Sequence, residues 1–450
     1  MIRGGAWASM LLLVLGGVSG CAPTSGWSVP PPDCSDAQGA SFTEDLAKWS
    51  RGEEAGADSA PFSDPRAYSE EDGLPVFHVY MASSLPDDDG YRPSRLIYRG
   101  QCHVIEARYR GDTSLSFPKR SMTLDFDDGQ TFDEPSIAGG FTGKRKVVLV
   151  SPFNDNSYLR HRLAFTLWNR LSPEHLRVKT FSAVVYMNGR YHGLYTVVDH
   201  VDRHLLDEQG QDEGGELFKA VEQSANFSRV DEFGVTKEHL WMGFEKKEGE
   251  PQEGEGATRS IEDFTAFVAD ATPEAFLAER GAWMDTRDYE DWWILATYAF
   301  LSDSVAKNAY HYRAREPGAV WRYIPWDLDA SFGQKWNTER QPAEELDLFT
   351  AQNRLFSRML EEPAIAGPLV ARYRELRQGP LHPDAVLGLV DAYAEEVRAA
   401  AHKDEARWGE AYRSFPRWAG RTDFNDFEGE LAYVRAWVRA RWGMLEEQLR

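Results

Sequence analysis

The sequence has little basic charge for its length and, after residue 20, no long hydrophobic run. Its 450 residues include 72 acidic but only 50 basic side chains, so the formal net charge is −22. A surface of that sign repels phosphate backbones, and nucleic-acid binding is therefore not expected. A nucleotide site is still compatible with it, because a metal ion and a few local cations can hold the phosphates. No later segment has the about eighteen consecutive apolar residues that a membrane-spanning helix needs.

Cysteine is also scarce, with three residues in the whole chain. Cys21 follows Val-Ser-Gly, and this ending resembles the bacterial lipobox, in which the cysteine becomes the lipid-modified first residue. Cys34 and Cys102 then remain as a pair in an oxidising compartment, which predicts a disulfide between them. The alternative is two unpaired thiols.

Residues 1–20 have the features of a signal peptide, because Arg3 precedes a short apolar stretch that ends in small residues. Together with Cys21 they predict an exported lipoprotein of the cell envelope, on the periplasmic side or the outer face of a membrane. The lipid is then the only membrane attachment. The alternative is an ordinary cleaved signal followed by an incidental cysteine.

Composition divides the remaining chain into a tether and a folded body. Residues 21–65 are rich in Pro, Ser, Asp, Gly and Glu and predict a disordered tether. Residues 66–450 predict an α+β fold, with a strand-rich half at about 66–205 and a helical half at about 206–450. Protein kinases use such a two-lobed layout, although a layout alone does not establish function.

Apolar runs and turn residues predict the individual elements. Strands are expected at 74–81, 103–109, 121–126, 146–150 and 181–187. Asn188-Gly189 between two apolar runs predicts a β-hairpin, and leucines at every fourth position predict a helix over 157–171. Further helices are expected at 260–269, 273–280, 287–301 and from about 356 onward, with one embedded hairpin at 309–314 and 320–325.

The pattern that points to chemistry spans this embedded hairpin. An apolar helix ends at Asp303, Asn308 follows, and the second strand delivers Asp327 and Asp329 before a Ser-Phe-Gly turn. Phosphoryl transfer needs a carboxylate for the hydroxyl proton, an amide oxygen for a metal ion, and a carboxylate that holds metal against the phosphates. The Asp-x-x-x-x-Asn spacing matches the catalytic loop of protein kinases, and the later Asp before Phe-Gly is similar to their metal-binding turn.

These motifs resemble the signature of the CotH (spore coat protein H) kinase family. Arg110-Gly-Asp-Thr-Ser114 is similar to the family's Arg-Gly-Asn-x-Ser run, and further similarity covers residues 117–121, 149–160, 186–195 and 216–219. The chain departs from the family at Asp112, where Asn is usual, and at Asp199, where Glu is common. It also has Leu301-Ser302 where protein kinases place His-Arg.

The resemblance implies a secreted or surface-displayed kinase-like protein that uses ATP with Mg²⁺ or Mn²⁺ to phosphorylate Ser or Thr of protein partners. It implies that Asp303 is the catalytic aspartate and that Asp327 is the chief metal carboxylate. Asn308 and Asp329 are then supporting metal ligands.

Phosphates must also be met by fixed positive charge and backbone donors. The turn at Gly111 and Ser114, between Arg110 and Lys119, is a candidate triphosphate site. Arg160 and Lys219 are candidates for the same role. Taken singly, each cation could instead be a solvated side chain.

Three other interpretations were weighed. Asp327 and Asp329 could serve a hydrolase, but alternate residues of a strand lie too close together for most two-carboxylate hydrolytic geometries. The chain could also be a non-catalytic assembly or adhesion module on the same fold. His200 and His204 have the spacing of a zinc pair, but a polar helix face is the better interpretation.

Overall fold

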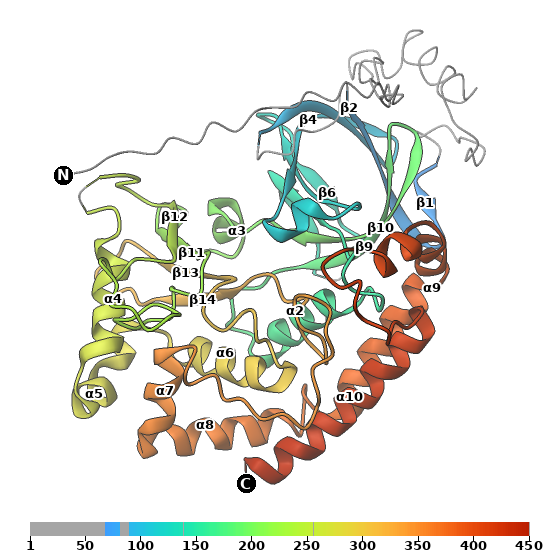
Figure 1. The fold of residues 1–450 in the computed structure, drawn as a ribbon. Helices are drawn as coiled ribbons and strands as arrows, with labels where there is room; N and C mark the ends of the chain where they lie inside the picture. Colours follow the sequence, from blue (N-terminus) through green and yellow to red (C-terminus); the bar gives the residue numbers. More distant parts are fainter. Residues whose placement is uncertain (1–67, 82–89, 138, 255, 450) are drawn as a thin grey trace, which may run out of the picture.

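A computed structural model describes residues 68–81, 90–137, 139–254 and 256–449 (Figure 1). It is a mixed α+β fold, as predicted. The predicted signal peptide and tether, with Cys21 and Cys34, lie outside the described residues. Cys102 is disulfide-bonded, and its pairing with Cys34 stays a prediction. Among the described helices, none has the length and apolar character needed to cross a membrane.

Eight strands of the N-terminal half form one sheet. In spatial order they are β1 (Glu70–Glu71), β2 (Leu74–Met81), β3 (Arg92–Tyr98), β4 (Gln101–Arg110), β5 (Ser121–Phe126), β8 (Lys146–Val150), β10 (Arg190–Asp199) and β9 (Thr180–Met187). Neighbours in this order are antiparallel, and a parallel pairing of β2 with β9 closes the sheet on itself. Apolar side chains of these strands, such as Phe77 and Val197, form a buried cluster of their own. The short strands β6 (Phe132–Glu134) and β7 (Phe141–Lys144) contribute Phe132 and Phe141 to this cluster.

The helix α2 (Arg160–Leu171) lies against β9, and Leu163, Leu167 and Leu171 are buried in the main core, as their spacing predicts. The helix begins at Arg160, three residues later than expected. The carboxylate of Asp155 explains the difference, because it accepts hydrogen bonds from the backbone N–H groups of Ser157 and Arg160 and holds the intervening residues in a turn.

The C-terminal half contains a second, four-stranded antiparallel sheet in the order β12 (Phe244–Glu248), β11 (Glu216–Ala220), β13 (Ala309–Arg313) and β14 (Arg322–Pro325). The expected hairpin is therefore the edge of a larger sheet. Its helices are α3 (Arg203–Glu208), α4 (Arg259–Asp270), α5 (Pro273–Trp283), α6 (Thr286–Ala299), α7 (Arg354–Glu361), α8 (Pro363–Leu376), α9 (Pro383–Arg413) and α10 (Phe427–Gln448). The long helices α9 and α10 pack against each other, and α9 returns to contact β10 of the first sheet (Figure 1).

Candidate active site

The loop after α6 carries Asp303. The helix ends where Phe300 adopts a left-handed backbone conformation, with φ of 55°. The buried indole N–H of Trp292 donates to the Ser304 carbonyl oxygen at 3.0 Å, which ties the loop to the aromatic core. The aromatic residues that precede Asp303 therefore pack in the core and support the loop.

The carboxylate of Asp303 is held by two neighbours in its own loop. The side-chain amide of Asn308 donates to it at 3.0 Å, and the ammonium of Lys307 forms an ion pair with it at 3.1 Å. Burial raises the pKa of Asp303 above its usual value, and the charge of Asp327 adds to the rise, although Lys307 opposes it. A carboxyl with a raised pKa is a stronger proton acceptor than an ordinary aspartate.

The hairpin β13–β14 brings Asn308 and Asp327 together. Ala309 lies opposite Pro325, so Asn308, just before β13, and Asp327, just after β14, lie at the same end of the hairpin. Both adopt left-handed backbone conformations, with φ of 58° and 56°. The Ser304 hydroxyl donates to the Asp327 carbonyl oxygen at 2.9 Å, which joins the catalytic loop to the second predicted motif.

Asp329 lies two residues further on and accepts a 2.8 Å hydrogen bond from the side-chain amide of Asn154. Burial, and then the charge of Asp327, raise the pKa of Asp329 above its usual value. In the described part of the chain no three His, Cys, Asp or Glu side chains are arranged to hold an ion by themselves. The donors are nevertheless carboxylate and amide oxygens, which suits Mg²⁺, an ion that takes one or two carboxylates and completes its shell with phosphates and waters.

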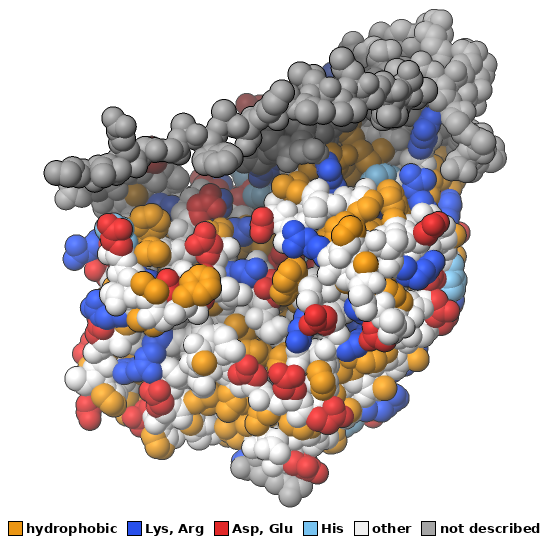
Figure 2. All heavy atoms as spheres, in the orientation of Figure 1, with side chains coloured by type: hydrophobic (Ala, Val, Ile, Leu, Met, Phe, Trp, Pro, Cys, Tyr) orange, Lys and Arg blue, Asp and Glu red, His pale blue; other side chains and the backbone are white. Residues whose placement is uncertain are grey.

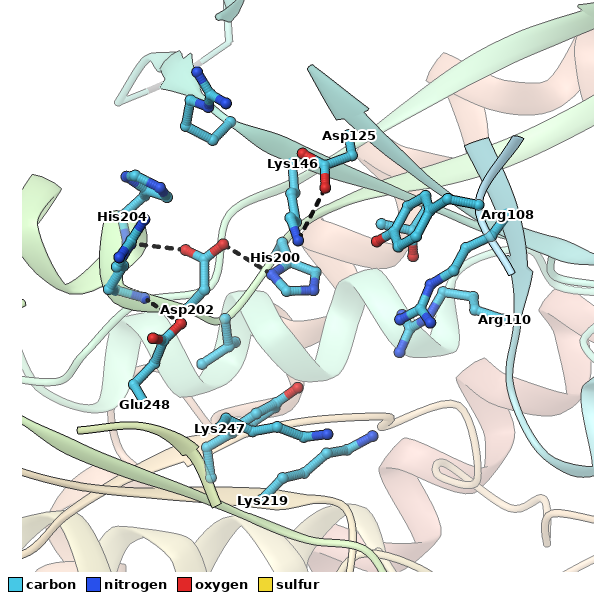
Figure 3. Close-up of a pocket in the computed structure, with 16 residues that line it drawn as sticks. Arg108, Arg110, Asp125, Lys146, His200, Asp202, His204, Lys219, Lys247 and Glu248 are labelled. Atoms are coloured by element: carbon cyan, nitrogen blue, oxygen red, sulfur yellow. Dashed lines mark hydrogen bonds and ion pairs between the residues drawn. The ribbon is translucent and has the colours of Figure 1, made fainter. Parts of the chain in front are cut away.

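A cavity of about 500 Å³ lies between the first sheet, α3 and the second sheet (Figure 3). Its lining is strongly cationic, although the whole chain is acidic. The lysines and arginines that line it are Arg108, Arg110, Arg145, Lys146, Arg203, Lys219 and Lys247, against the carboxylates of Asp125, Asp202 and Glu248. Over the face shown in Figure 2, acidic and basic side chains are interspersed, so the concentration of cations is a property of the cavity.

Asp303, Asn308, Asp327 and Asp329 do not line the cavity, but Arg110, which does, reaches the neighbourhood of Asp327. The guanidinium of Arg110 lies 4.9 Å from the ring centre of Trp326, the residue before Asp327. Burial, followed by the charge of Arg110, lowers the pKa of Lys219 to about 8, and Asp327 partly counteracts this shift. Two crowded cations beside carboxylates fit the polyphosphate of a nucleotide whose terminal group faces Asp303 and Asp327.

The structure does not bring Lys119 and Arg160 to this cavity. The ammonium of Lys119 is fully buried and forms a 2.6 Å ion pair with Asp404 of α9. Arg160 is also fully buried, pairs with Asp155 and Glu430, and donates to the Ser331 carbonyl oxygen at 3.0 Å. Both predicted phosphate contacts are therefore corrected: Lys119 joins the two halves, and Arg160 supports the turn after Asp329.

Gly111 and Ser114 belong to the loop that follows Arg110. Gly111 has φ of 118°, and a Cβ atom there would lie 1.8 Å from the Ser114 hydroxyl oxygen, so the loop requires glycine. The next residue after the loop, Phe117, packs in an aromatic cluster with Phe153 and Trp418. Neither Gly111 nor Ser114 lines the cavity, and their contact with phosphate stays a prediction.

The structure adds residues that the sequence analysis missed. Lys307 lies inside the Asp-x-x-x-x-Asn motif, and its proximity to Asp303 could have been inferred from that position. His161 follows Arg160 and is buried, with no hydrogen-bond partner for either ring nitrogen among the described residues. Burial, and the charge of Arg110, lower the pKa of His161 to about 4.

His200 and His204 both line the cavity. The ring of His200 lies 3.0 Å from a carboxylate oxygen of Asp202, and Asp202 in turn caps α3. No metal-holding group of His, Cys, Asp and Glu side chains occurs in residues 68–81, 90–137, 139–254 and 256–449. The expected polar helix face is only partly formed, because His200 precedes α3 and only His204 lies within it.

Comparison with known proteins identifies relatives of this chain. A sequence model of a family described as CotH kinase protein matches residues 107–445. Inner spore coat protein H of Bacillus subtilis (strain 168) is 30% identical over 304 residues, which cover 65% of this chain and 78% of that protein. The family match includes Asp303, Asn308, Asp327 and Asp329.

Proposed function

Because this chain belongs to the CotH kinase protein family, we propose that it transfers the γ-phosphate of ATP to Ser or Thr of an exported or surface protein. The observation that carries the proposal is that two cations of the cavity lie within the electrostatic influence of Asp327, one of the clustered carboxylates. Arg110 and Lys219 line the cavity and are both influenced by the charge of Asp327. We further propose that the strand-rich and helical halves correspond to the two lobes of a kinase-like fold.

In this proposal Asp303 accepts the proton of the acceptor hydroxyl. The hydroxyl oxygen then forms a bond to the γ-phosphorus while the bond from that phosphorus to the β–γ bridging oxygen breaks, which leaves ADP. Lys307, which forms an ion pair with Asp303, is placed to meet the negative charge of the transferred group. Arg110 and Lys219 hold the remaining phosphates.

Asp327, with Asn308 and Asp329, would hold Mg²⁺ or Mn²⁺. The ion, when bound, would supply positive charge to the phosphate oxygens. Asn154 fixes Asp329 through its 2.8 Å hydrogen bond, and Arg160 fixes the following turn through the Ser331 carbonyl oxygen. These contacts hold the carboxylates in place without a ligand.

We also propose that the protein acts in the cell envelope, attached to a membrane only by a lipid on Cys21. Its relative is described as an inner spore coat protein, a component of a surface layer, which supports a location outside the cytoplasm for this chain. A nucleic acid partner is not part of the proposal, because the net charge of −22 opposes contact with a phosphate backbone.

The decisive experiment incubates the full-length protein with ATP labelled at the γ-phosphate, Mg²⁺ or Mn²⁺, and envelope proteins of the same cell. Metal-dependent labelling of protein Ser or Thr is expected, and Asp303→Asn should abolish it without changing the thermal unfolding midpoint. Release of inorganic phosphate without labelled protein would favour the hydrolase. Absence of both products would favour a non-catalytic assembly module.

A further inference from the structure

A β-bulge in β12 turns two consecutive side chains toward the cavity. Leu217 of β11 lies opposite Glu248. The next residue of β11, Phe218, lies opposite Lys246, so Lys247 is an extra residue in β12. A bulge breaks the usual alternation of side chains between the two faces of a strand. Lys247 and Glu248 consequently both line the cavity (Figure 3).

Glu248 differs from the other two carboxylates of the cavity in its partners. Asp125 forms an ion pair with a lysine at 3.0 Å, and Asp202 both caps α3 and contacts His200. Glu248 accepts a long hydrogen bond, at 3.4 Å, from the backbone N–H of Arg203, and no ion pair of the described residues includes it. The carboxylate of Glu248 is half-buried and can accept further hydrogen bonds. Because the cations around it attract phosphates, it suits a ligand that carries neutral hydrogen-bond donors as well as phosphates.

Glu248 lies at the end of the cavity away from the catalytic loop. The backbone N–H of Asn308 donates to the Ala220 carbonyl oxygen at 2.9 Å, at the C-terminal end of β11. Leu217, opposite Glu248, lies three residues earlier (220 − 217), which is about 10 Å along a strand. Lys219 lies between the two positions. A nucleotide with its terminal phosphate at the catalytic loop therefore passes its phosphates along Lys219 and brings its sugar toward Glu248.

We propose that Glu248 accepts a hydrogen bond from a ribose hydroxyl and thereby selects a ribonucleoside triphosphate over other polyphosphates. The inference rests on the proposed function, because it assigns a residue to the sugar of the same nucleotide. Carboxylates recognise ribose hydroxyls in other nucleotide-binding folds, where the hydroxyl donates and the carboxylate accepts. The amine of adenine is the other neutral donor of ATP, but it lies farther from the phosphates than the ribose does.

Calorimetric titration in the presence of Mg²⁺ tests this assignment. ATP and inorganic triphosphate are titrated into the full-length protein, into Glu248→Gln, and into Glu253→Gln. Glu253 is an exposed carboxylate in the loop after β12, so its variant is a control for the same change of charge. Glu248→Gln is expected to weaken ATP binding about tenfold, ~1.4 kcal/mol, and to leave the affinity for inorganic triphosphate unchanged. Glu253→Gln should change neither affinity.

Deoxynucleotides identify the group that Glu248 contacts. If Glu248 contacts the 2′ or the 3′ hydroxyl, the ATP analogue that lacks this hydroxyl should bind the unsubstituted protein about tenfold more weakly than ATP. Glu248→Gln should not weaken the binding of that analogue further, because the contact is already lost. Equal losses for ATP and inorganic triphosphate, or an unchanged ATP affinity, would overturn the assignment. The assignment would also be overturned if inosine triphosphate, and neither deoxynucleotide, bound more weakly than ATP. Inosine triphosphate lacks the amine and keeps both hydroxyls, so that result would place the amine at Glu248. Failure of every polyphosphate to bind the unsubstituted protein would refute the proposed function itself.

Discussion

Lys119 and Lys219 are both predicted from the sequence to meet phosphates, and the structure predicts opposite results for their substitution. Lys119→Met keeps the apolar stem of the side chain but removes the ammonium. The carboxylate of Asp404 then stays buried with a 2.7 Å hydrogen bond from the backbone N–H of Leu194 and without its cation. Removing one partner of a buried ion pair costs about 3–5 kcal/mol, a large part of the about 5–15 kcal/mol that stabilises a typical domain.

Urea denaturation, followed by tryptophan fluorescence, measures this loss as a lower unfolding midpoint at an unchanged slope. The double variant Lys119→Met/Asp404→Leu is the control, and it should recover most of the stability because neither buried charge remains. Lys219→Met should keep the unfolding midpoint and weaken ATP binding about tenfold or more, because it removes a charge-assisted phosphate contact. An unchanged midpoint for Lys119→Met together with weaker ATP binding would refute this reasoning and return Lys119 to the nucleotide site.

Three further predictions concern the carboxylates and the anchor. Asp303→Ala should keep metal-dependent ATP binding in calorimetry, while its rate of phosphate transfer falls ~10²-fold or more. Asp327→Ala should lose both ATP binding and transfer. Identical ATP binding by the two variants would contradict their assigned roles. Burial alone would raise the pKa of Glu430, but two guanidinium groups that pair with it lower the value to about 2. The ionised Glu430 contributes about 3 kcal/mol to the free energy of unfolding above pH 4.5, and this contribution is lost as the pH falls toward 2. Glu430→Gln should therefore make the free energy of unfolding depend less steeply on pH in this range. An unchanged pH dependence would count against the ion pairs. Cys21→Ser should release the protein from the membrane fraction, and its retention there would exclude the lipid anchor.

The elements that the sequence predicts well are those whose own residues determine them. β2 and β5 have the predicted bounds because their own residues favour strands: β2 is an almost continuous apolar run, β5 alternates polar and apolar residues, and turn residues flank both. β12, with the sequence Phe-Glu-Lys-Lys-Glu, has no such pattern and was not predicted. It forms because β11 provides backbone partners, and its bulge depends on that pairing. Propensity gives no information about such tertiary pairing.

The same distinction applies to the site. Asp303, Asn308, Asp327 and Asp329 were found because their relative positions depend on one short loop and one hairpin. The cations were harder to assign, because a buried structural lysine and a phosphate-binding lysine look alike in a sequence. Only the fold reveals that the partner of Lys119 lies 285 residues further along the chain.

The ties between the first sheet and the last two helices have a consequence for the order of folding. Every predicted catalytic, metal and phosphate residue precedes position 330, yet Lys119 obtains its counter-ion from α9 and Arg160 obtains one from α10. A chain that emerges N-terminus first must therefore leave Lys119 without Asp404 until α9 has appeared, and Arg160 without Glu430 until α10 has appeared. A chain truncated before α9 is expected to bind no nucleotide although it contains the whole site. Under the proposed function, phosphoryl transfer is therefore expected only after α9 and α10 have packed against the first sheet and α2.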